Sequence, residues 1–370
     1  QRNTHYPAMK TGTAASAVSL LQQLIATPSF SREENRTADI LADFLSFHHI
    51  AFQRKGNNVW AVQAHFDSRK PTLLLNSHHD TVKPNPAYTR DPFSPALEDG
   101  KLFGLGSNDA GGALVSLLEA FRQLYHRQDL GYNLVLAATA EEEISGTGGI
   151  ELIWNDLPRI DCAIVGEPTL MKAAIAEKGL MVLDCVALGK AGHAARNEGI
   201  NAIYEALPDI EWFRTFSFPK HSDVLGPVKM SVTVIQAGQA HNQVPPQCTF
   251  TVDVRATDAY TLDDMLAIIR ANVRCQVTPR SLRLRPSALS ENHPLYRVAK
   301  QLGIPLYGSP TTSDQALIPV PSLKMGPGDS ARSHSADEYI FVDEIEAGIK
   351  KYIEFIETLS STGNPQPQVS

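Results

Sequence analysis

The chain has 370 residues, of which 43% are hydrophobic and 20% are charged, and its formal net charge at pH 7 is −7. This length exceeds one ordinary hydrophobic core, so the composition predicts a globular protein of about two domains. The negative charge and the lack of a long basic run argue against a nucleic-acid partner, and no apolar run approaches the ~20 residues of a membrane helix.

The four cysteines show no paired spacing, and no secretory signal opens the sequence. Cysteines of this kind are typical of reduced, mostly buried thiols. We therefore expect a cytoplasmic protein. The cysteines are Cys162, Cys185, Cys248 and Cys275.

Strands alternate with helices up to about residue 173. The segment 83–99, rich in proline and polar residues, is typical of a long functional loop. The alternation predicts a mainly parallel sheet that is covered by helices on both faces. Helices are predicted over 14–26, 31–47, 112–124 (after the glycine-rich segment 104–112) and from about 147, and strands over 51–54, 58–64, 72–77, 134–138 and 162–165.

The pattern changes after residue 173 to the order strand–helix–strand–strand–helix–strand, which is typical of a small ferredoxin-like α+β layer. The first three strands of this order are predicted at 181–188, 228–236 and 247–255, and the helices at 199–216 and 262–273. The α/β character resumes from residue 286, with a helix near 294–302, a strand near 322–325 and a last helix at 342–359.

The domain organisation follows from these two patterns. We expect an α/β catalytic domain built from residues 13–173 and 286–360, and a small α+β domain inserted between them at residues 174–285. The segments 1–12 and 361–370 are polar and are expected to be flexible.

An apolar strand that ends in Glu141, Glu142 and Glu143 is the first sign of a functional site. Ligands of open α/β sheets bind beyond the carboxyl ends of the strands. Three adjacent carboxylates repel one another, so a bound cation or a proton-transfer role explains them better than folding does. A solvated loop with adjacent acids is the alternative.

Other polar side chains follow strand ends in the same way. Two imidazoles and three carboxylates in such positions would suit a divalent metal such as zinc, and their wide spread in sequence suits a catalytic site rather than a zinc finger. Taken singly, Asp109 is better explained as a helix N-cap and His78 as a hydrogen-bonded core histidine. The candidates are His78, Asp80, Asp109, Glu141, Glu142, Glu143, Glu167 and His334.

Five segments resemble, in order, the motifs of the di-zinc aminoacylase and carboxypeptidase family, which includes acetylornithine deacetylase and succinyl-diaminopimelate desuccinylase. The resemblance covers nearly the whole chain. The segments are 77–80, 106–112, 139–143, 166–169 and 326–334 with Glu338.

The resemblance implies a site for two divalent ions, expected to be Zn²⁺ with Co²⁺ as the alternative. In it, His78 and Glu167 bind one ion, Glu143 and His334 bind the other, and Asp109 bridges the two. Bound zinc would lower the pKa of a water molecule toward neutrality.

The resemblance also assigns the residues that assist the metal ligands. Asp80 orients the ring of His78 from behind, and Glu142 is the general base that accepts the proton of the attacking water. Glu141 has no assigned role, so the assignment depends on the register of the three glutamates. The peptide bond between Asp109 and Ala110 is expected to be cis.

Substrate contacts are implied in both domains. His193 resembles a family histidine that crosses a dimer interface and stabilises the oxyanion of the partner's substrate. From spacing alone, His193 would be a surface histidine and Arg255 the partner of a strand-end salt bridge. The residues implied to contact substrate, including an arginine suited to a carboxylate, are Asn242, Arg255, Thr312, Ser313 and Gly328.

The expected function is the metal-dependent hydrolysis of the amide bond of a small N-acyl-L-amino acid. N-acetylornithine, or a succinylated or citrulline-type variant in arginine biosynthesis, is the closest match. The alternatives are succinyl-diaminopimelate desuccinylation, a dipeptidase or tripeptidase activity, and a non-catalytic binding protein, against which the complete ligand set argues. A homodimer through the inserted domain is also expected.

Overall fold

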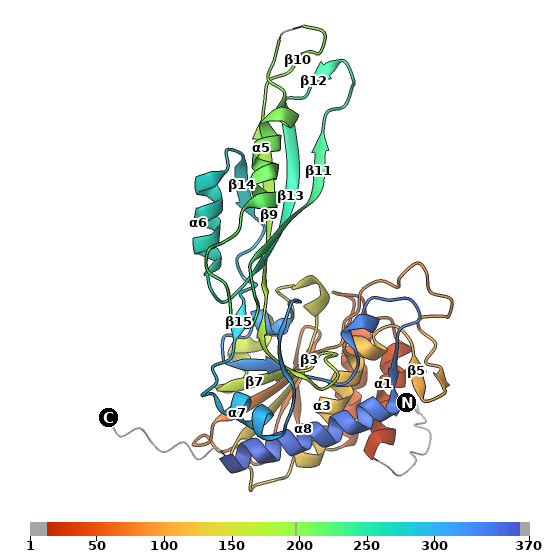
Figure 1. Ribbon diagram of the computed structural model, residues 1–370. Helices are drawn as coiled ribbons and strands as arrows, with labels where there is room; N and C mark the ends of the chain where they lie inside the picture. The colour runs from red at the N-terminus through yellow and green to blue at the C-terminus, as the bar shows by residue number, and fades with distance from the viewer. Residues whose placement is uncertain (1–12, 197, 363–370) are drawn as a thin grey trace. The chain divides into compact units, whose positions relative to one another are not determined.

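The computed structural model describes residues 13–196 and 198–362, so the predicted flexible segment 1–12 and most of 361–370 lie outside the described residues. The chain forms two compact units (Figure 1). The larger unit comprises the residues up to 175, 289–307 and those from 313 onward, and the smaller unit comprises 176–288 and 308–312.

The segment 308–312 belongs to the smaller unit, although the sequence places it in the catalytic domain. The reason is its hydrogen bonds. The amide of Lys178 donates to the carbonyl of Ser309 at 3.0 Å, and the hydroxyl of Thr312 donates to the carbonyl of Lys178 at 2.9 Å.

The larger unit is built on a twisted sheet with the strand order β1-β2-β6-β3-β7-β17-β8. Strands β6, β3, β7 and β17 are parallel, whereas β1 and β2 form an antiparallel hairpin beside β6. The predicted parallel core is therefore confirmed. The strands are β1 (Phe52–Lys55), β2 (Asn58–Val62), β3 (Thr72–His78), β6 (Asn133–Thr139), β7 (Cys162–Val165), β8 (Ala173–Glu177) and β17 (Ser322–Lys324).

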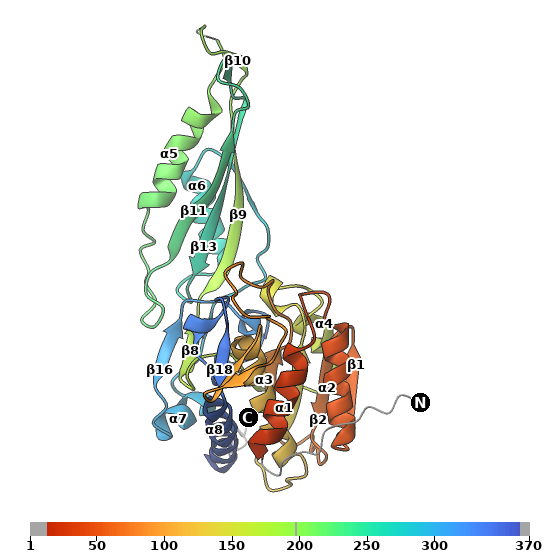
Figure 2. The same cartoon turned by 90° about the vertical axis from the view of Figure 1, so that its right-hand side faces the viewer.

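Helices cover both faces of this sheet, as predicted (Figure 2). Because side chains alternate along a strand, Leu73 and Leu75 of β3 pack against one layer and Leu74 packs against the other. The thicker layer consists of α1 (Thr13–Ile25), α2 (Asn35–Phe47), α3 (Gly112–Leu124), α7 (Pro294–Gln301) and α8 (Val342–Thr362). The thinner layer contains α4 (Ile150–Ile153), the 3₁₀ turn η3 (Trp154–Asp156) and residues 317–320, which follow the 3₁₀ turn η4 (Asp314–Ala316).

A three-stranded sheet lies within the larger unit, and two further short strands pair with β8. These strands are β4 (Leu97–Glu98), β5 (Lys101–Phe103) and β18 (Tyr339–Phe341) in the small sheet, and β15 (Ser287–Ala288) and β16 (Leu306–Ser309) beside β8. Of the two beside β8, β15 lies in the smaller unit and β16 crosses the boundary between the units.

Some predicted boundaries are wrong. Helix α2 begins at residue 35 rather than 31, because Glu34 turns its carboxylate to the amide of Arg32 and the side chain of Asn57. The helix predicted from 147 is only α4, since the preceding glycines form a loop around the Glu141 carboxylate. Helix α8 runs on to Thr362, into the segment predicted to be flexible.

The smaller unit is an antiparallel sheet of order β11-β13-β9-β14 with two helices on one face. Alternate residues of β9 and β13 are buried against these helices, which gives the predicted α+β layer. The elements are β9 (Gly179–Leu188), α5 (Ala202–Thr215), β11 (Lys229–Ala237), β13 (Gln247–Ala256), α6 (Leu262–Asn272), β14 (Gln276–Pro279) and a ribbon of β10 (Gly192–His193) with β12 (Gln243–Val244). Of the helices that the structure describes, none is both long and apolar enough to cross a bilayer.

Candidate metal centre

The turn after β6 separates the three consecutive glutamates. Glu141 adopts a left-handed conformation with φ of 57°, and the 3₁₀ turn η2 (Glu142–Ile144) follows it. The Glu141 carboxylate accepts a hydrogen bond from the amide of Gly148 at 3.2 Å and lies 4.0 Å from Arg32. Glu141 therefore holds the glycine loop, and the turn leaves Glu142 and Glu143 available to the site.

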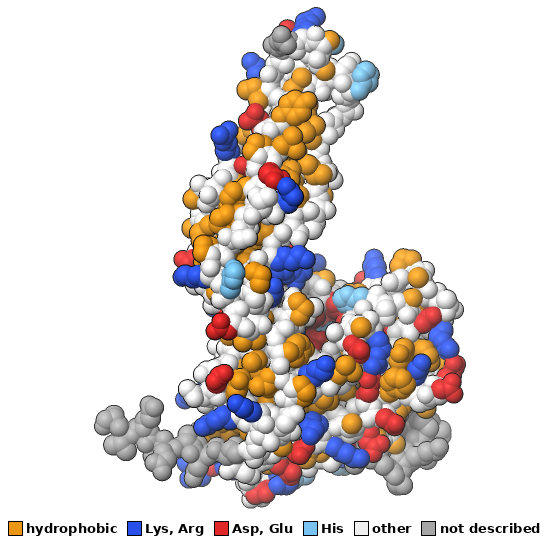
Figure 3. All heavy atoms as spheres, in the orientation of Figure 1, with side chains coloured by type: hydrophobic (Ala, Val, Ile, Leu, Met, Phe, Trp, Pro, Cys, Tyr) orange, Lys and Arg blue, Asp and Glu red, His pale blue; other side chains and the backbone are white. Residues whose placement is uncertain are grey.

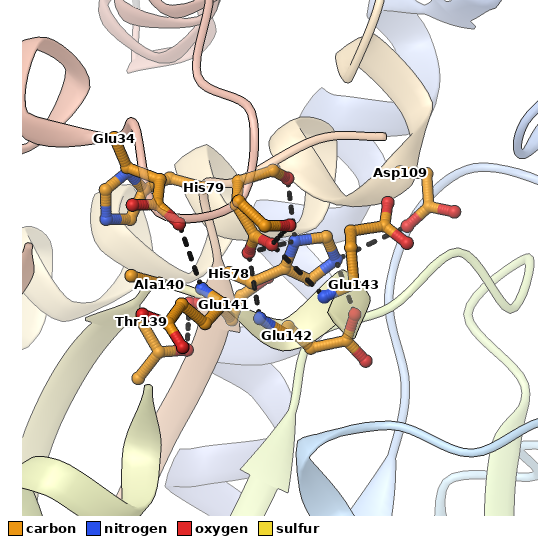
Figure 4. Close-up of polar contacts among 12 residues, drawn as sticks. Glu34, His78, His79, Asp109, Thr139, Ala140, Glu141, Glu142 and Glu143 are labelled. Carbon is orange, nitrogen blue, oxygen red and sulfur yellow. Dashed lines mark hydrogen bonds and ion pairs between the residues drawn. The ribbon is translucent and has the colours of Figure 1, made fainter. Parts of the chain in front are cut away.

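His78, the last residue of β3, is the centre of a first group of ligand atoms. Its Nε2 atom lies 3.4 Å from Asp109 Oδ1, 3.6 Å from Glu167 Oε1 and 3.7 Å from Glu142 Oε2. Figure 4 shows the ring directed toward Asp109 and Glu142. The nitrogen is buried and has no hydrogen-bond partner among the described residues, which is what a metal-binding nitrogen requires.

A second group shares Asp109 with the first. His334 Nε2 lies 3.0 Å from Glu143 Oε2 and 3.5 Å from Asp109 Oδ2. One carboxylate oxygen of Asp109 thus faces His78 and the other faces His334. In each group of three, the ligand atoms lie within 4.8 Å of one another, so both groups fit a divalent ion.

Burial and mutual repulsion make the ionised form of these neighbouring carboxylates unfavourable in free energy when no cation is bound. Burial raises the pKa of Glu167 to about 8 and the pKa of Glu142 well above its usual range. Burial opposes protonation of His78, but the surrounding carboxylates, with Glu142 and Glu167 the largest contributors, raise the pKa of that ring well above its usual value. A divalent cation among these groups would stabilise the carboxylates as anions, which supports their assignment as metal ligands.

Asp80 organises the centre through its backbone as well as its side chain. His78 Nδ1 lies 3.0 Å from the carbonyl oxygen of Asp80 and 3.4 Å from its carboxylate, so a proton on Nδ1 leaves Nε2 free for a metal. The Asp80 carboxylate also accepts the amides of Glu142 and Glu143, each at 3.1 Å, and the hydroxyl of Ser31 at 2.7 Å.

Glu338 is a buried residue to which the sequence assigned no role. Its carboxylate accepts the amides of Gly106, Asn108 and Asp109 at 3.1, 2.9 and 2.8 Å. It therefore holds the π-helical turn η1 (Ser107–Gly111) that presents Asp109. The sequence signalled this residue only through its place in the last family motif, four positions after His334, without indicating its contacts. The Asp109–Ala110 peptide is cis, which confirms that expectation.

The residues implied to contact substrate lie in both units. In the smaller unit, the β10–β12 ribbon brings two of them together, since the amide of Ala194, next to His193, donates to the carbonyl of Asn242 at 3.0 Å. Arg255 pairs with Asp253 at 2.8 Å, which matches the salt-bridge alternative.

The other substrate candidates have structural contacts of their own. Thr312 belongs to the smaller unit through its bond to Lys178. Ser313 caps η4 by accepting the amide of Gln315 at 3.3 Å. Gly328 has a φ of 91°, and a Cβ atom there would approach Asn108 Oδ1 to 2.5 Å, so this position requires glycine.

Comparison with known proteins identifies the class of enzyme. The sequence profile of Peptidase family M20/M25/M40 matches residues 74–358, and the chain therefore belongs to this family. It is a hydrolase of a family of metal-dependent enzymes that cleave amide bonds, as the sequence predicted.

Curated relatives cover almost the whole chain. Acetylornithine deacetylase of Proteus mirabilis (strain HI4320) is 29% identical over 364 residues, which cover 89% of this chain and 93% of the relative. The enzyme of the same name from Pectobacterium carotovorum subsp. carotovorum (strain PC1) is 30% identical over 356 residues, covering 87% and 92%.

Solved structures share the fold at lower identity. The M20 family metallo-carboxypeptidase from Sulfolobus solfataricus has a TM-score of 0.74 and 18% identity, covering 93% of this chain and 99% of that one. A tripeptidase from Staphylococcus aureus subsp. aureus mu50 has a TM-score of 0.76 and 18% identity, covering 94% and 99%. A dinuclear metal-binding peptidase from Bacillus subtilis has a TM-score of 0.68 and 14% identity, covering 96% and 100%.

Proposed function

We propose that this protein hydrolyses the amide bond of an N-acyl-L-amino acid, with two divalent ions as cofactors and Zn²⁺ as the expected metal. The observation that carries the proposal is the position of Asp109, whose two oxygens face His78 and His334. His78 and Glu167 would hold one ion with Asp109, and Glu143 and His334 would hold the other.

The metal ions, when bound, would polarise the amide carbonyl and lower the pKa of the attacking water. The chain supplies the proton transfers. The Glu142 carboxylate would accept the proton of that water and pass it to the leaving nitrogen. Its position beside the first group, 3.7 Å from His78 Nε2, supports this role, and Asp80 fixes its backbone through the amide.

Metal binding provides a direct test of the bridging role. We expect wild-type protein to bind two ions, and Asp109→Ala to bind both more weakly because each group loses a ligand. Glu167→Ala should weaken mainly one ion, and His334→Ala mainly the other. Titration of metal-free protein with Zn²⁺ measures these affinities. An Asp109→Ala protein with one undisturbed tight ion would argue against bridging.

N-acetylornithine is the proposed substrate, because relatives of that activity match the chain over about nine-tenths of its length. The solved peptidase structures share the fold of this chain, but at this low sequence identity they do not bear on the choice of substrate. Succinylornithine, acetylcitrulline and succinylcitrulline are the nearest variants of this substrate.

A substrate screen tests this choice. We expect the metal-loaded protein to hydrolyse an N-acylated ornithine or citrulline with a higher kcat/KM than succinyl-diaminopimelate, dipeptides or tripeptides. Colorimetric detection of the released amine gives the rates. A preference for unacylated peptides would overturn the proposed substrate class, and no turnover of any amide would favour a binding role.

We propose that the protein is a cytoplasmic homodimer that associates through the smaller unit. Strand β11 is an edge strand, and large apolar side chains are exposed on it and on α5. Figure 3 shows hydrophobic side chains gathered over this unit. An exposed edge with apolar neighbours is a surface that a second chain can cover. The exposed residues are Tyr204, Leu207, Val234 and Ile235.

A further inference from the structure

His334 is the most exposed of the candidate metal ligands. Its side chain is 54% exposed, compared with 8% for Glu143 and 1% for His78. It stands on the segment between the 3₁₀ turn η5 (Ser330–Arg332) and β18, and its φ of 58° is unusual for a residue other than glycine. Contacts from elsewhere must therefore hold the ring in position.

The base of this segment is fixed to α8. The guanidinium of Arg332 donates to both carboxylate oxygens of Glu344 at 2.6 and 2.9 Å and to the carbonyl of Tyr339 at 3.3 Å. Such a two-pronged charge-assisted contact restricts orientation as well as position. It fixes where the His334 segment begins.

Residues 334–337 of the segment are held by hydrogen bonds to the proline-rich loop 83–99. The Asp337 carboxylate accepts the amides of Thr89 and Arg90 at 2.9 and 3.0 Å and the hydroxyl of Thr89 at 2.5 Å. The side-chain amide of Asn85 donates to the carbonyl of His334 at 3.2 Å.

A third contact joins the same two segments. The hydroxyl of Tyr88 accepts the amide of Glu338 at 3.4 Å. Residues 85–90 therefore contact residues 334–338 at three places, nearly 250 positions apart in sequence.

We propose that residues 85–90 form a clamp that positions His334 for the metal ion shared with Asp109 and Glu143. The inference rests on the proposed two-ion function. Asp337 and Asn85 are the positioning residues, because they join the clamp to the ligand-bearing segment. The other ion depends on His78 and Glu167, whose side chains are almost buried. Because Asp337 and Asn85 contact the segments that carry His334, their loss should weaken the His334 ion.

Zinc titration of metal-free variants tests the clamp. Asp337→Gly removes the carboxylate, and glycine tolerates the left-handed backbone found there, with φ of 52°. Loss of a partner that orients a ligand costs about 10- to 100-fold in metal affinity. We expect that loss for the His334 ion and an unchanged affinity for the His78 ion.

Three variants refine the test. Thr89→Val removes the hydroxyl but keeps the amide, and Asp337→Asn keeps an oxygen acceptor, so both should weaken the His334 ion less than Asp337→Gly. Asp91→Gly is the matched control, because the Asp91 carboxylate accepts the amide of Phe93 within the same loop at 2.9 Å. It should bind both ions as the wild type does.

Unchanged zinc affinities in Asp337→Gly, or an equal loss for both ions, would overturn the clamp. Asn85→Ala provides the same test if Asp337→Gly fails to fold, since it removes one hydrogen bond to the His334 carbonyl. Wild-type protein that never binds a second ion would overturn the two-ion function and the clamp together. Two ions in the wild type with no selective loss in the variants would overturn the clamp alone.

Discussion

Glu142→Gln should fold and bind two metal ions as the wild type does, while its kcat falls by about 10²- to 10⁴-fold. Glutamine has nearly the same shape and volume as glutamate but cannot accept a proton. The backbone amide of Glu142 donates to Asp80, and this contact does not depend on the side chain, so the turn should persist. Steady-state kinetics with parallel metal analysis measures both effects.

Glu141→Gln is the matched control. The Glu141 carboxylate binds the amide of Gly148 and lies near Arg32, so its loss affects the glycine loop rather than proton transfer. The variant should keep a kcat close to that of the wild type, with some loss of stability. An inactive Glu141→Gln beside an active Glu142→Gln would show that the two glutamates have the opposite roles.

Much of the fold follows from local patterns in the sequence. The apolar runs that become β3, β6 and β7 are buried on both faces, so their hydrophobicity identifies them directly. Because parallel strands end at one edge of a sheet, His78 and the glutamate turn could be expected to meet there. The structure brings these groups together with Asp109, Glu167 and His334.

The hydrogen bonds that local sequence patterns did not indicate join residues that are far apart in the chain. Glu338 binds the amides around Asp109 some 230 residues away, and Asp337 binds residues 89 and 90 in the same way. A single acid in a polar loop carries no local sign of such a partner. Strand β8 was also missed, because its short alanine-rich sequence has little strand propensity.

His193 is expected to complete the site of a partner subunit, and removing it should lower kcat by about 10²- to 10³-fold, the cost of losing one oxyanion donor. The ring is exposed on β10, and its Nδ1 accepts the amide of Ala195 at 3.1 Å. The proton must then be on Nε2, which leaves that nitrogen as a donor. Such a donor can stabilise the negative charge that develops on the carbonyl oxygen.

Mixed dimers provide the decisive measurement. In a dimer of Glu142→Gln with His193→Ala, one site has both defects and the other has neither, so each mixed dimer should recover up to about half of the activity of a wild-type dimer. Mixing Glu142→Gln with a chain that carries both substitutions is the control, because no site in that mixture has an intact base. Failure to recover activity despite proven subunit exchange, or full activity in a protein shown to be monomeric, would refute the shared site.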